Sequence, residues 1–394
     1  MIIRIETSLA DTKIETPVLV LDREKVAKNY QQFCQKMHGI DIFYAVKANP
    51  HPDILALLVS EGAYFDCASF QEISLVMAAG SAPSKISFGS TIKKSTDIAA
   101  AYDVGVRYFT FDACEELQKI AYHAPGSRVW CRILTNDFGT GAQWPLSKKF
   151  GCDQTMAIDL MSKAASMGLI PSGISFHVGS QQTEPTAWQA PILQLKKIFQ
   201  KLADRGIILD TINLGGGFPT TFGNSTVPNI SKYAEVIQAA LDFHFGKEKP
   251  RLIAEPGRAL VGDAGIIVSE VVLVSTKSSN DATRWVYLDV GRFHGLAETE
   301  GEAIRYRFTV PERQDSARCP AIIAGPTCDS VDTLYERNPV EMPVDLKAGD
   351  IVLVHDTGAY TATYSSVGFN GLSPLQVRLV EDVNQIKFPK LQAV

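Results

Sequence analysis

Eight short runs rich in β-branched and aromatic residues recur along the chain, and this recurrence limits the possible folds most strongly. They are Asp41–Ala48, Ala63–Ser69, Ile86–Ser90, Arg107–Asp112, Val129–Leu134, Gly173–Gly179, Thr211–Phe218 and Arg251–Gly257. Between them lie segments with apolar residues at the i, i+3 and i+4 spacing of amphipathic helices, such as Asp53–Glu61, Gln71–Ala79 and Ser231–Phe243. Alternating β and α units of this kind predict a parallel sheet.

Eight such units over residues 22–262 match the ~250 residues of a (β/α)₈ barrel. An open doubly wound sheet is the alternative, because a sequence does not show whether a sheet closes. After residue 262, strand-like segments follow without regular helices between them: Ile266–Thr276, Trp285–Leu288, Ala321–Ala324, Ile351–His355 and Leu375–Leu379. We therefore predict an α/β chain with a barrel over residues 22–262 and an antiparallel β domain over 263–394. Residues 1–21 would join that domain through the strand-like Thr16–Leu21.

Composition excludes several classes of protein. The 394 residues include 43 acidic and 38 basic side chains, a net charge of −5, which argues against a nucleic-acid partner. The longest aliphatic run, Ile54–Val59, is far shorter than the ~20 residues of a membrane span, and the N-terminus lacks an apolar signal segment. Seven scattered cysteines form no C-x-x-C pair. We expect a cytoplasmic protein with no membrane partner and no metal site.

Active sites of β/α barrels lie at the carboxyl ends of the strands. The first predicted strand ends in YAVKANP, which places Lys47 in otherwise apolar sequence. Such a lysine either points into water or, when desolvated, becomes a nucleophile that forms Schiff bases. The local sequence leaves both interpretations open.

The other strand ends carry polar residues and glycines: Asp66, Arg132, His177, Ser180, Gly215–Gly217, Glu255 and Arg258. Three consecutive glycines let backbone N–H groups approach an anion, although a tight turn explains them equally well. Glu255 and Arg258 could likewise form a structural ion pair. A phosphate cradle, a Schiff-base lysine and a lone carboxylate are the parts that a pyridoxal phosphate (PLP) site requires. The carboxylate would keep the ring nitrogen protonated, so that the ring accepts electrons.

Six motifs make a family resemblance specific: YAVKAN, FDCAS, SFHVGSQ, NLGGGFP, AEPGRALV and GPTCDSVD. In this order and spacing, over residues 16–372, the chain resembles the ornithine/diaminopimelate/arginine decarboxylase family. The resemblance implies the alanine-racemase-like fold (fold type III), with a PLP-binding barrel and a β domain, and a homodimer with shared active sites. WPLSKKFG, YLDVGRFHGLAE and GPTCDSVD resemble the ornithine or lysine/ornithine branch.

The resemblance also implies roles for residues at the barrel mouth. Lys47 would bind PLP as a Schiff base beside Asp66, Glu255 would pair with the pyridine nitrogen, and His177 would stack on the ring. Arg132 would support Lys47 and Glu255. The cofactor phosphate would be bound by Ser180, Gly215, Gly216, Gly217, Gly257, Arg258 and Tyr360.

By the same resemblance, Cys328 would protonate the substrate carbon after CO₂ leaves, and Asp329 would bind the distal ammonium. Both would enter the site of the partner subunit, and Lys149 and Asp332 would pair across the interface. Gly301 departs from the acidic residue expected in the short substrate helix. Its neighbours Glu298, Glu300 and Glu302 are acidic, and we predict Glu300 and Glu302 as substrate contacts, with a solvated loop face as the alternative.

The expected reaction is decarboxylation of L-ornithine to putrescine in polyamine synthesis, with L-lysine to cadaverine as a possible side activity. A diaminopimelate, arginine or specialised-pathway amino-acid decarboxylase of the same fold is the nearest alternative. A catalytically inactive regulator that resembles antizyme inhibitors is the alternative from another class. A racemase would need a second base, which the sequence does not identify.

Overall fold

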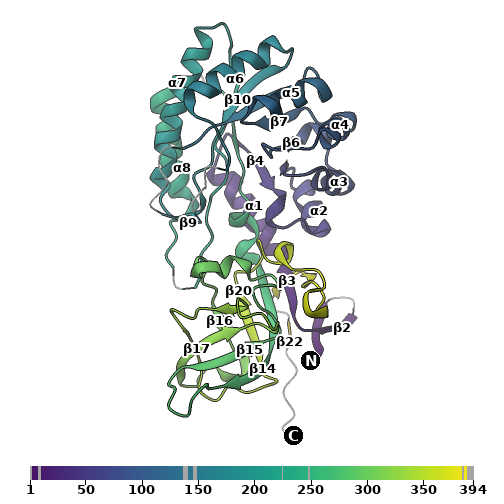
Figure 1. The fold of residues 1–394 in the computed structure, drawn as a ribbon, viewed down its shortest axis with the longest axis vertical. Coiled ribbons are helices and arrows are strands. Elements are labelled where there is room, and N and C mark those ends of the chain that lie inside the picture. Colours follow the sequence, from purple (N-terminus) through teal and green to yellow (C-terminus); the bar gives the residue numbers. More distant parts are fainter. Residues whose placement is uncertain are drawn as a thin grey trace. The chain divides into compact units, whose positions relative to one another are not determined.

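The chain divides into two compact units (Figure 1). The computed structural model describes residues 2–7, 10–135, 141–144, 149–223, 225–246, 249–383 and 386–387. The barrel unit comprises Ala27–Pro219 and Val227–Ala259, and the β unit comprises Met1–Val26, Thr220–Thr226 and Leu260–Val394. The short segment Thr220–Thr226 belongs to the β unit, although it lies inside the range 22–262 predicted for the barrel.

Eight parallel strands close into a barrel, as predicted, and the open sheet is excluded. The strands, in barrel order, are β4 (Ile40–Ala45), β5 (Tyr64–Cys67), β6 (Ile86–Phe88), β7 (Tyr108–Phe111), β8 (Arg128–Arg132), β10 (Ile170–Ser175), β12 (Thr211–Asn213) and β13 (Arg251–Ala254). Pairing of β13 with β4 completes the ring. Each predicted run contributes one strand, because its β-branched and aromatic residues suit a sheet covered on both faces.

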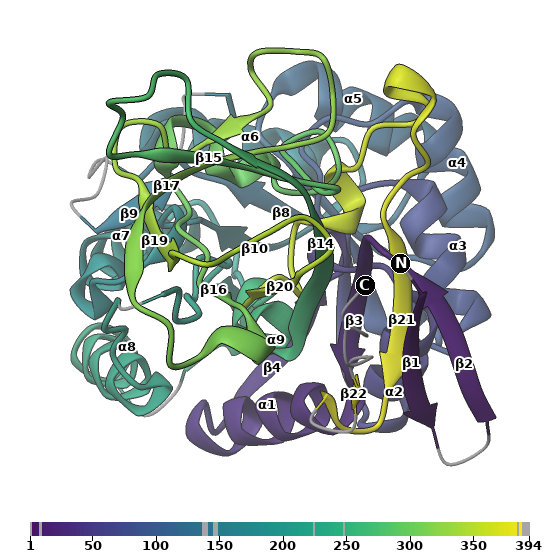
Figure 2. The same cartoon turned by 90° about the horizontal axis from the view of Figure 1, so that it is seen from below.

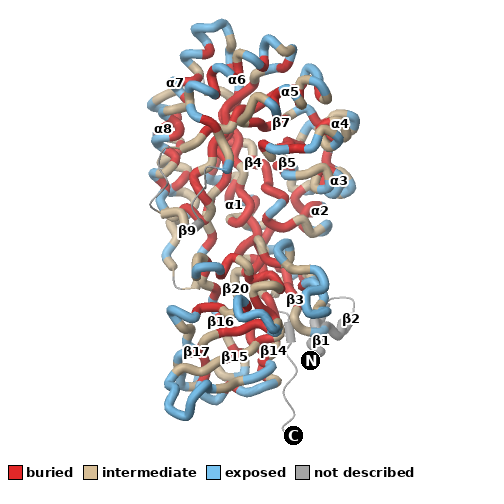
Figure 3. Tube along the Cα trace, in the orientation of Figure 1, coloured by how far each residue is buried: buried red, intermediate tan, exposed pale blue. Residues whose placement is uncertain are grey.

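Helices alternate with these strands: α1 (Arg23–Lys36), α2 (Pro52–Ser60), α3 (Phe70–Ala78), α4 (Ser95–Asp103), α5 (Cys114–His123), α6 (Gln154–Ser166), α7 (Gln189–Ala203) and α8 (Ile230–Phe245). Figure 3 shows buried strands inside and alternately buried and exposed turns along the helices. In α7, for example, Ile192, Leu195 and Ile198 are buried at helical spacing. The short strands β9 (Ala142–Trp144) and β11 (Ser180–Gln182) pair with each other.

An aromatic layer fills the barrel interior. Phe43 of β4, Trp130 of β8 and Ile253 of β13 are buried against one another, and Tyr64 and Tyr108 pack on them. Strands β4 and β8 are not neighbours in the ring, so their contact crosses the interior. The barrel is therefore a packed core, and a ligand has room only at its ends.

Side chains on a strand alternate between its two faces, so residues two positions apart share a face. Asp66 comes two residues after Tyr64, Arg132 two after Trp130, and Glu255 two after Ile253. Charged groups from three strands therefore lie next to the aromatic layer on the side of the strands' carboxyl ends.

Arg251 lies at the opposite end of β13 and packs against three rings of the aromatic layer. Its guanidinium is 5.3, 5.7 and 5.8 Å from the ring centres of Tyr64, Phe43 and Tyr108. Its Nε also donates to Asp41 at 2.7 Å. A planar guanidinium can lie flat against a ring while its edge donates, a geometry that a tetrahedral ammonium lacks.

We therefore expect Arg251→Met to lower the free energy of unfolding by about 1–2 kcal/mol, through loss of the ring contacts and the ion pair. Arg251→Lys keeps the charge, so its free energy of unfolding should fall by about half as much as that of Arg251→Met. Urea unfolding of wild type and both variants measures this. Equal losses for the two variants would contradict a role for planar stacking.

The β unit contains a mixed sheet (Figure 2). Its strands are β3 (Val18–Asp22), β14 (Gly265–Ser275), β15 (Arg284–Leu288), β16 (Phe308–Thr309), β17 (Arg318–Ala324), β18 (Thr333–Leu334), β19 (Val340–Pro343), β20 (Ile351–His355) and β21 (Gln376–Val380). Most pairs are antiparallel, and the predicted N-terminal strand joins the sheet as β3 beside β14. The prediction of an antiparallel domain is incomplete, because β15–β17 and β3–β21 are parallel pairs.

A separate small sheet contains β1 (Ile2–Thr7), β2 (Ala10–Glu15) and β22 (Ile386–Lys387). The short helix α9 (Arg258–Val261) follows the last barrel strand. In the described ranges, no helix has the length and apolar character needed to cross a membrane.

Candidate active site

Lys47 follows β4 in a single 3₁₀ turn, Val46–Ala48, whose other two residues are buried. Lys47 itself is exposed, so the structure does not show the desolvation expected of a nucleophilic lysine, and its bond to the cofactor stays a prediction. Its positive charge acts on two carboxyl groups, Asp66 and Glu72, and lowers the pKa of each against the opposing effect of burial.

Asp66, at the end of β5, is 7% exposed and accepts a hydrogen bond from the Ser87 hydroxyl at 3.0 Å. Burial and the nearby charge of Glu255 raise its pKa well above the usual value, and Lys47 opposes them. A Cβ at Gly89 would overlap the Asp66 carboxylate, so the loop after β6 needs glycine there. Gly89 could not be identified from the sequence, because its contact with Asp66 joins two strands.

Glu255 is held by an amide that the sequence analysis did not identify. Asn213, the last residue of β12, donates from Nδ2 to Glu255 Oε1 at 2.5 Å and accepts the Gly215 N–H on Oδ1 at 2.9 Å. The Glu255 N–H donates to the Gly215 carbonyl at 2.8 Å. The carboxylate and the start of the glycine run are thus joined by one side chain.

The three glycines leave no space for side chains. At Gly215, with φ +65°, a Cβ would overlap the carbonyl of Phe176, and at Gly216 it would lie 2.7 Å from the Glu255 carbonyl. At Gly217, with φ +102°, it would overlap the Gly179 carbonyl. The structure thus requires glycine at these positions for close packing, and the same bare backbone suits an anion.

Ser180 and Arg258 lie together, because Arg258 Nη2 donates to the Ser180 hydroxyl at 3.2 Å. Arg258 is only 3% exposed, at the start of α9. Gly179 joins this pair to the glycine run through its contact with Gly217. Gly257 precedes Arg258 and is buried. The structure therefore brings together the predicted phosphate-binding residues of the barrel unit.

His177 Nδ1 accepts the Gly179 N–H at 3.0 Å, which fixes its ring beside the glycine loop. Burial, together with the charges of Arg132 and Lys47, lowers the pKa of His177 well below its usual value. The imidazole is therefore neutral near pH 7. A neutral ring can lie against a flat aromatic cofactor without adding a positive charge to it.

Arg132, at the end of β8, lies among carboxylates. Burial lowers the pKa of its guanidinium, whereas Glu255, Asp112 and Asp66 raise it. Asp112, which the sequence analysis did not single out, accepts the Gly151 N–H at 2.7 Å. It therefore fixes Gly151 to the carboxyl end of β7.

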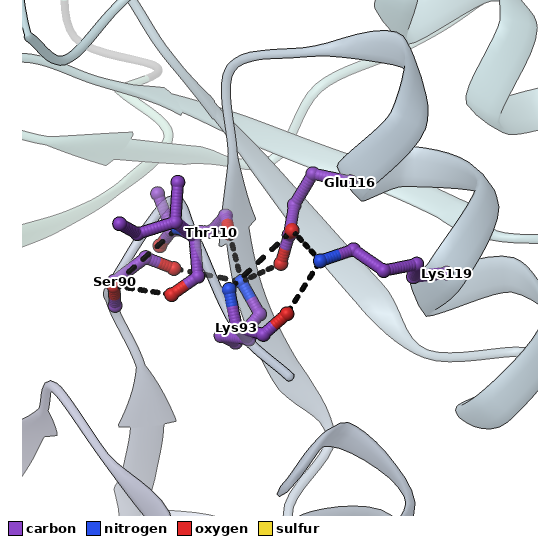
Figure 4. A network of polar contacts seen from close by, with 6 residues as sticks. Ser90, Lys93, Thr110, Glu116 and Lys119 are labelled. Carbon is purple, nitrogen blue, oxygen red and sulfur yellow. Dashed lines mark hydrogen bonds and ion pairs between the residues drawn. The ribbon is translucent and has the colours of Figure 1, made fainter. Parts of the chain in front are cut away.

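A polar network near the site contains Lys93, a second lysine to consider as the residue that binds the cofactor (Figure 4). Lys93 is fully buried, and its Nζ contacts the carbonyls of Ser90 and Thr110 at 2.7 and 2.6 Å and Glu116 at 2.9 Å. Burial lowers the pKa of Lys93 to about 8. Since two carbonyls accept hydrogen bonds from its ammonium and Glu116 forms an ion pair with it, Lys93 has a structural role, in contrast to the exposed Lys47.

This network borders a cavity of about 490 Å³ formed by the loops that follow β5, β6 and β7. Its described lining is Ala68, Ser69, Phe88, Thr91, Ile92, Lys93, Lys94, Asp97, Asp112, Ala113, Glu115, Glu116 and Lys119, which includes none of the predicted site residues. Asp112, whose charge also acts on Arg132, is thus the residue that links this cavity to the site.

The remaining predicted residues belong to the β unit. Cys328 is exposed, and its backbone N–H and thiol both donate to Asn370 Oδ1, at 3.0 and 3.3 Å. Asp329 accepts the Val331 N–H at 2.9 Å. Tyr360 lies in a turn with φ +55°. Asn370 is a further contact that the sequence analysis did not identify, since it comes 42 residues after Cys328.

Asp332 organises the loop that carries Cys328. It is 2% exposed and accepts the Arg292 N–H at 2.7 Å, the Thr327 hydroxyl at 2.7 Å and the Thr327 N–H at 3.2 Å. A Cβ at Gly325 would overlap its carboxylate. The ion pair between Lys149 and Asp332 needs a second chain and stays a prediction.

The acidic segment Ala297–Glu302 consists of 3₁₀ turns separated by a kink at Glu300 and Gly301, whose backbone angles are not helical. Glu302 pairs with Arg305 and accepts the N–H groups of Arg337 and Asn338. Glu300 pairs with Arg292. Gly301 has φ +59°, which glycine adopts without strain. Both glutamates therefore stabilise their own unit, and their substrate contacts stay predictions.

These residues fit PLP. An exposed lysine amine can bond to the cofactor's carbonyl carbon, a carboxylate is held by Asn213, and the side-chain-free backbone of Gly215–Gly217 joins Arg258 in an anion cradle. The barrel and its mouth define a PLP-binding enzyme of the (β/α)₈ class.

Comparison with known proteins identifies the family. The family model described as pyridoxal-dependent decarboxylase, pyridoxal binding domain, matches residues 23–262. The lysine/ornithine decarboxylase of Selenomonas ruminantium is 33% identical, over 94% of this chain and 91% of that protein. Antizyme inhibitor 2 of Xenopus laevis is 32% identical, over 92% of this chain and 80% of that protein. A solved structure of SrLDC in complex with PLP and cadaverine matches with a TM-score of 0.85 and 31% identity, over 94% of this chain and 92% of that chain. The chain belongs to the family of pyridoxal-dependent decarboxylases, and PLP is its cofactor.

If Lys93 is structural, Lys93→Met should destabilise the protein by about 3 kcal/mol, because Glu116 loses a buried partner. The double variant Lys93→Met/Glu116→Leu should regain much of this loss, since no carboxylate is then buried there. Thermal unfolding of the three proteins measures the effect. A double variant less stable than Lys93→Met would contradict this assignment.

Asp356, in the β unit, provides a pH test. Burial raises the pKa of its carboxyl to about 6, with Arg307 and Lys25 opposing and Asp263 reinforcing the shift. The unfolded carboxyl titrates near pH 4, so the folded state binds more protons between about pH 4 and 6. The contribution of this protonated carboxyl to the free energy of unfolding is complete below pH 4 and is lost as the pH rises through 6.

We compare the free energy of unfolding of Asp356→Asn with that of wild type at two pH values. The difference should shift in favour of the variant by about 1 kcal/mol between pH 5 and pH 7.5, after allowance for solvent screening. Asn also tolerates the φ of +63° at this position. Urea midpoints of both proteins at the two pH values test this. A difference independent of pH would refute the assignment.

Proposed function

We propose that this protein decarboxylates a basic amino acid, with L-ornithine as the preferred substrate and putrescine as the product. L-Lysine, giving cadaverine, would be a secondary substrate. The observation that carries the proposal is the cluster of Lys47, Asp66, His177 and Glu255 beside the Gly215–Gly217 cradle. The lysine/ornithine decarboxylase relative supports the substrate class.

Bound PLP supplies an aromatic ring that accepts the electron pair left on the substrate carbon when CO₂ departs. Lys47 would hold the cofactor through its exposed amine and give way to the substrate amine. Glu255, fixed by Asn213, would hold a proton at the ring nitrogen. His177, which is neutral, would cover one face of the ring. Ser180, Tyr360, Gly257 and Arg258 would bind the phosphate with the glycine backbone.

Two residues of the β unit would complete the reaction. The exposed Cys328 thiol would give its proton to the substrate carbon, in the partner subunit's site of a homodimer. Asp329 would bind the distal ammonium of the substrate. Its exposed carboxylate accepts the Val331 N–H, whereas Glu302 also pairs with a cation, so Asp329 is the better candidate for this contact.

Release of CO₂ from ornithine, lysine, arginine and diaminopimelate, measured side by side, tests the substrate class. We expect ornithine to give the highest kcat/KM and lysine the next. The highest value for diaminopimelate or arginine would instead assign the alternative decarboxylase functions. The polyamine pathway and the cytoplasmic location stay predictions from the sequence.

The similarity to antizyme inhibitor 2 gives the second candidate, a catalytically inactive regulator. The chain retains Lys47, Glu255 and Cys328, which argues for an enzyme. Absorption near ~420 nm after addition of PLP, where Schiff bases of PLP absorb, separates the two. No such band and no CO₂ from any substrate would favour the regulator.

Cys328→Ala should impair amine formation more than CO₂ release, because the variant keeps the electron-accepting cofactor and Lys47 but loses the proton donor. The molar ratio of CO₂ to amine should therefore rise above one. Gas release and chromatography of the amine give both quantities. A wild-type rate with equal amounts of the two products would rule out Cys328 as the acid.

A shared site also predicts complementation. Lys47→Ala and Cys328→Ala homodimers each lack one group at both sites, but a mixed dimer has one intact site. Random exchange makes half of the dimers mixed, so ~25% of wild-type activity should return. Mixing must allow subunit exchange, verified by differently tagged chains. Mixed dimers with no more activity than their parents would show that the site is not shared.

A further inference from the structure

The Asn213 side chain occupies a fully buried position between two parts of the candidate PLP site. Its Nδ2 donates to Glu255 Oε1 at 2.5 Å, and its Oδ1 accepts the Gly215 N–H at 2.9 Å. These partners fix the orientation of the amide, since the flipped form would place oxygen against a carboxylate and an N–H₂ group against an N–H.

The surrounding backbone makes this link rigid. The Gly215 carbonyl accepts the Glu255 N–H at 2.8 Å. The Leu214 N–H donates to the Ile253 carbonyl at 2.8 Å, which continues the pairing of β12 with β13. A Cβ at Gly216 would meet both the Glu255 carbonyl and His177 Nε2. The carboxylate, the glycine loop and the imidazole are therefore packed too closely to move separately, and Asn213 is the side chain that joins the first two.

We propose that Asn213 is a positioning residue that aligns the Glu255 carboxylate with the ring nitrogen of PLP while it holds the first glycine of the phosphate cradle. This inference rests on the proposed role of Glu255. Asn213 acts through its neighbours, and its amide is needed because one end must donate to a carboxylate and the other must accept from an N–H. Loss of the amide should affect both the affinity for PLP and the protonation of its ring.

The test uses the full-length protein, prepared without cofactor and then titrated with PLP. Asn213→Ala should weaken PLP binding about 10- to 100-fold, the range that loss of an orienting outer partner costs at metal sites. With PLP labelled with ¹⁵N in its ring, the nitrogen resonance of the bound cofactor should move towards the unprotonated value. With substrate, kcat should fall by a larger factor than KM changes.

Ser175→Ala is the matched control. Ser175 pairs in register with Asn213 on the adjacent strand β10, is 4% exposed, and its hydroxyl has no hydrogen-bond partner among the described residues. Ser175→Ala should bind PLP with an affinity within twofold of wild type. Its ¹⁵N shift should equal that of wild type within error. Asn213→Ser, whose hydroxyl is too short to reach both partners, should reproduce the effects of Asn213→Ala with a smaller packing change.

Wild-type PLP affinity with a protonated ring nitrogen in Asn213→Ala would overturn the proposal. It would also be rejected if neither Asn213 variant folded, because the residue would then be a core determinant, or if Ser175→Ala changed the spectrum equally. A wild-type protein that binds PLP but decarboxylates no amino acid would refute the proposed function while leaving these binding and ¹⁵N results interpretable.

Discussion

The electrostatic balance at the barrel mouth is the constraint on which the site depends. Lys47 and Arg132 lie among Asp66, Glu255 and Glu72, and the pKa shifts of Asp66, Arg132 and His177 all have burial as their largest cause. For Asp66 and Arg132, opposite charges nearby oppose the effect of burial on the charged form. A cofactor with a carbonyl group, a ring nitrogen and a phosphate would meet a matching group at each of these points.

The closed barrel makes this balance possible. The aromatic layer around Phe43 and Trp130, with Ile253 packed against it, fills the interior, so polar side chains that share its face gather where the strands end. Strands that are far apart in the sequence then bring the residues that follow them together. Lys47 and Glu255 are separated by 208 positions in the chain, yet they come just after the neighbouring strands β4 and β13. Closure, rather than any single motif, assembles the site.

Much of this could be predicted from the sequence. The β/α alternation predicted all eight barrel strands, because hydrophobic pattern and strand length are local properties. The residues of the mouth were predicted from the family resemblance of motifs such as NLGGGFP, and the glycine run alone left a tight turn open as the alternative. Asn213, Asp112, Gly89 and Asn370 could not be predicted, since their importance lies in contacts between separate strands or loops. The parallel pairs β15–β17 and β3–β21 were missed for the same reason: strand composition does not show the direction of a partner.

The central claim is that Lys47, and not the buried Lys93, carries the cofactor. Borohydride reduction of the PLP-loaded protein converts a Schiff base into a stable secondary amine, and peptide mass spectrometry then locates it. The account predicts a phosphopyridoxyl group on the peptide that contains Lys47, and none after reduction of Lys47→Ala loaded in the same way. Stoichiometric modification at Lys93 or another lysine of the wild-type protein, with Lys47 unmodified, would contradict it.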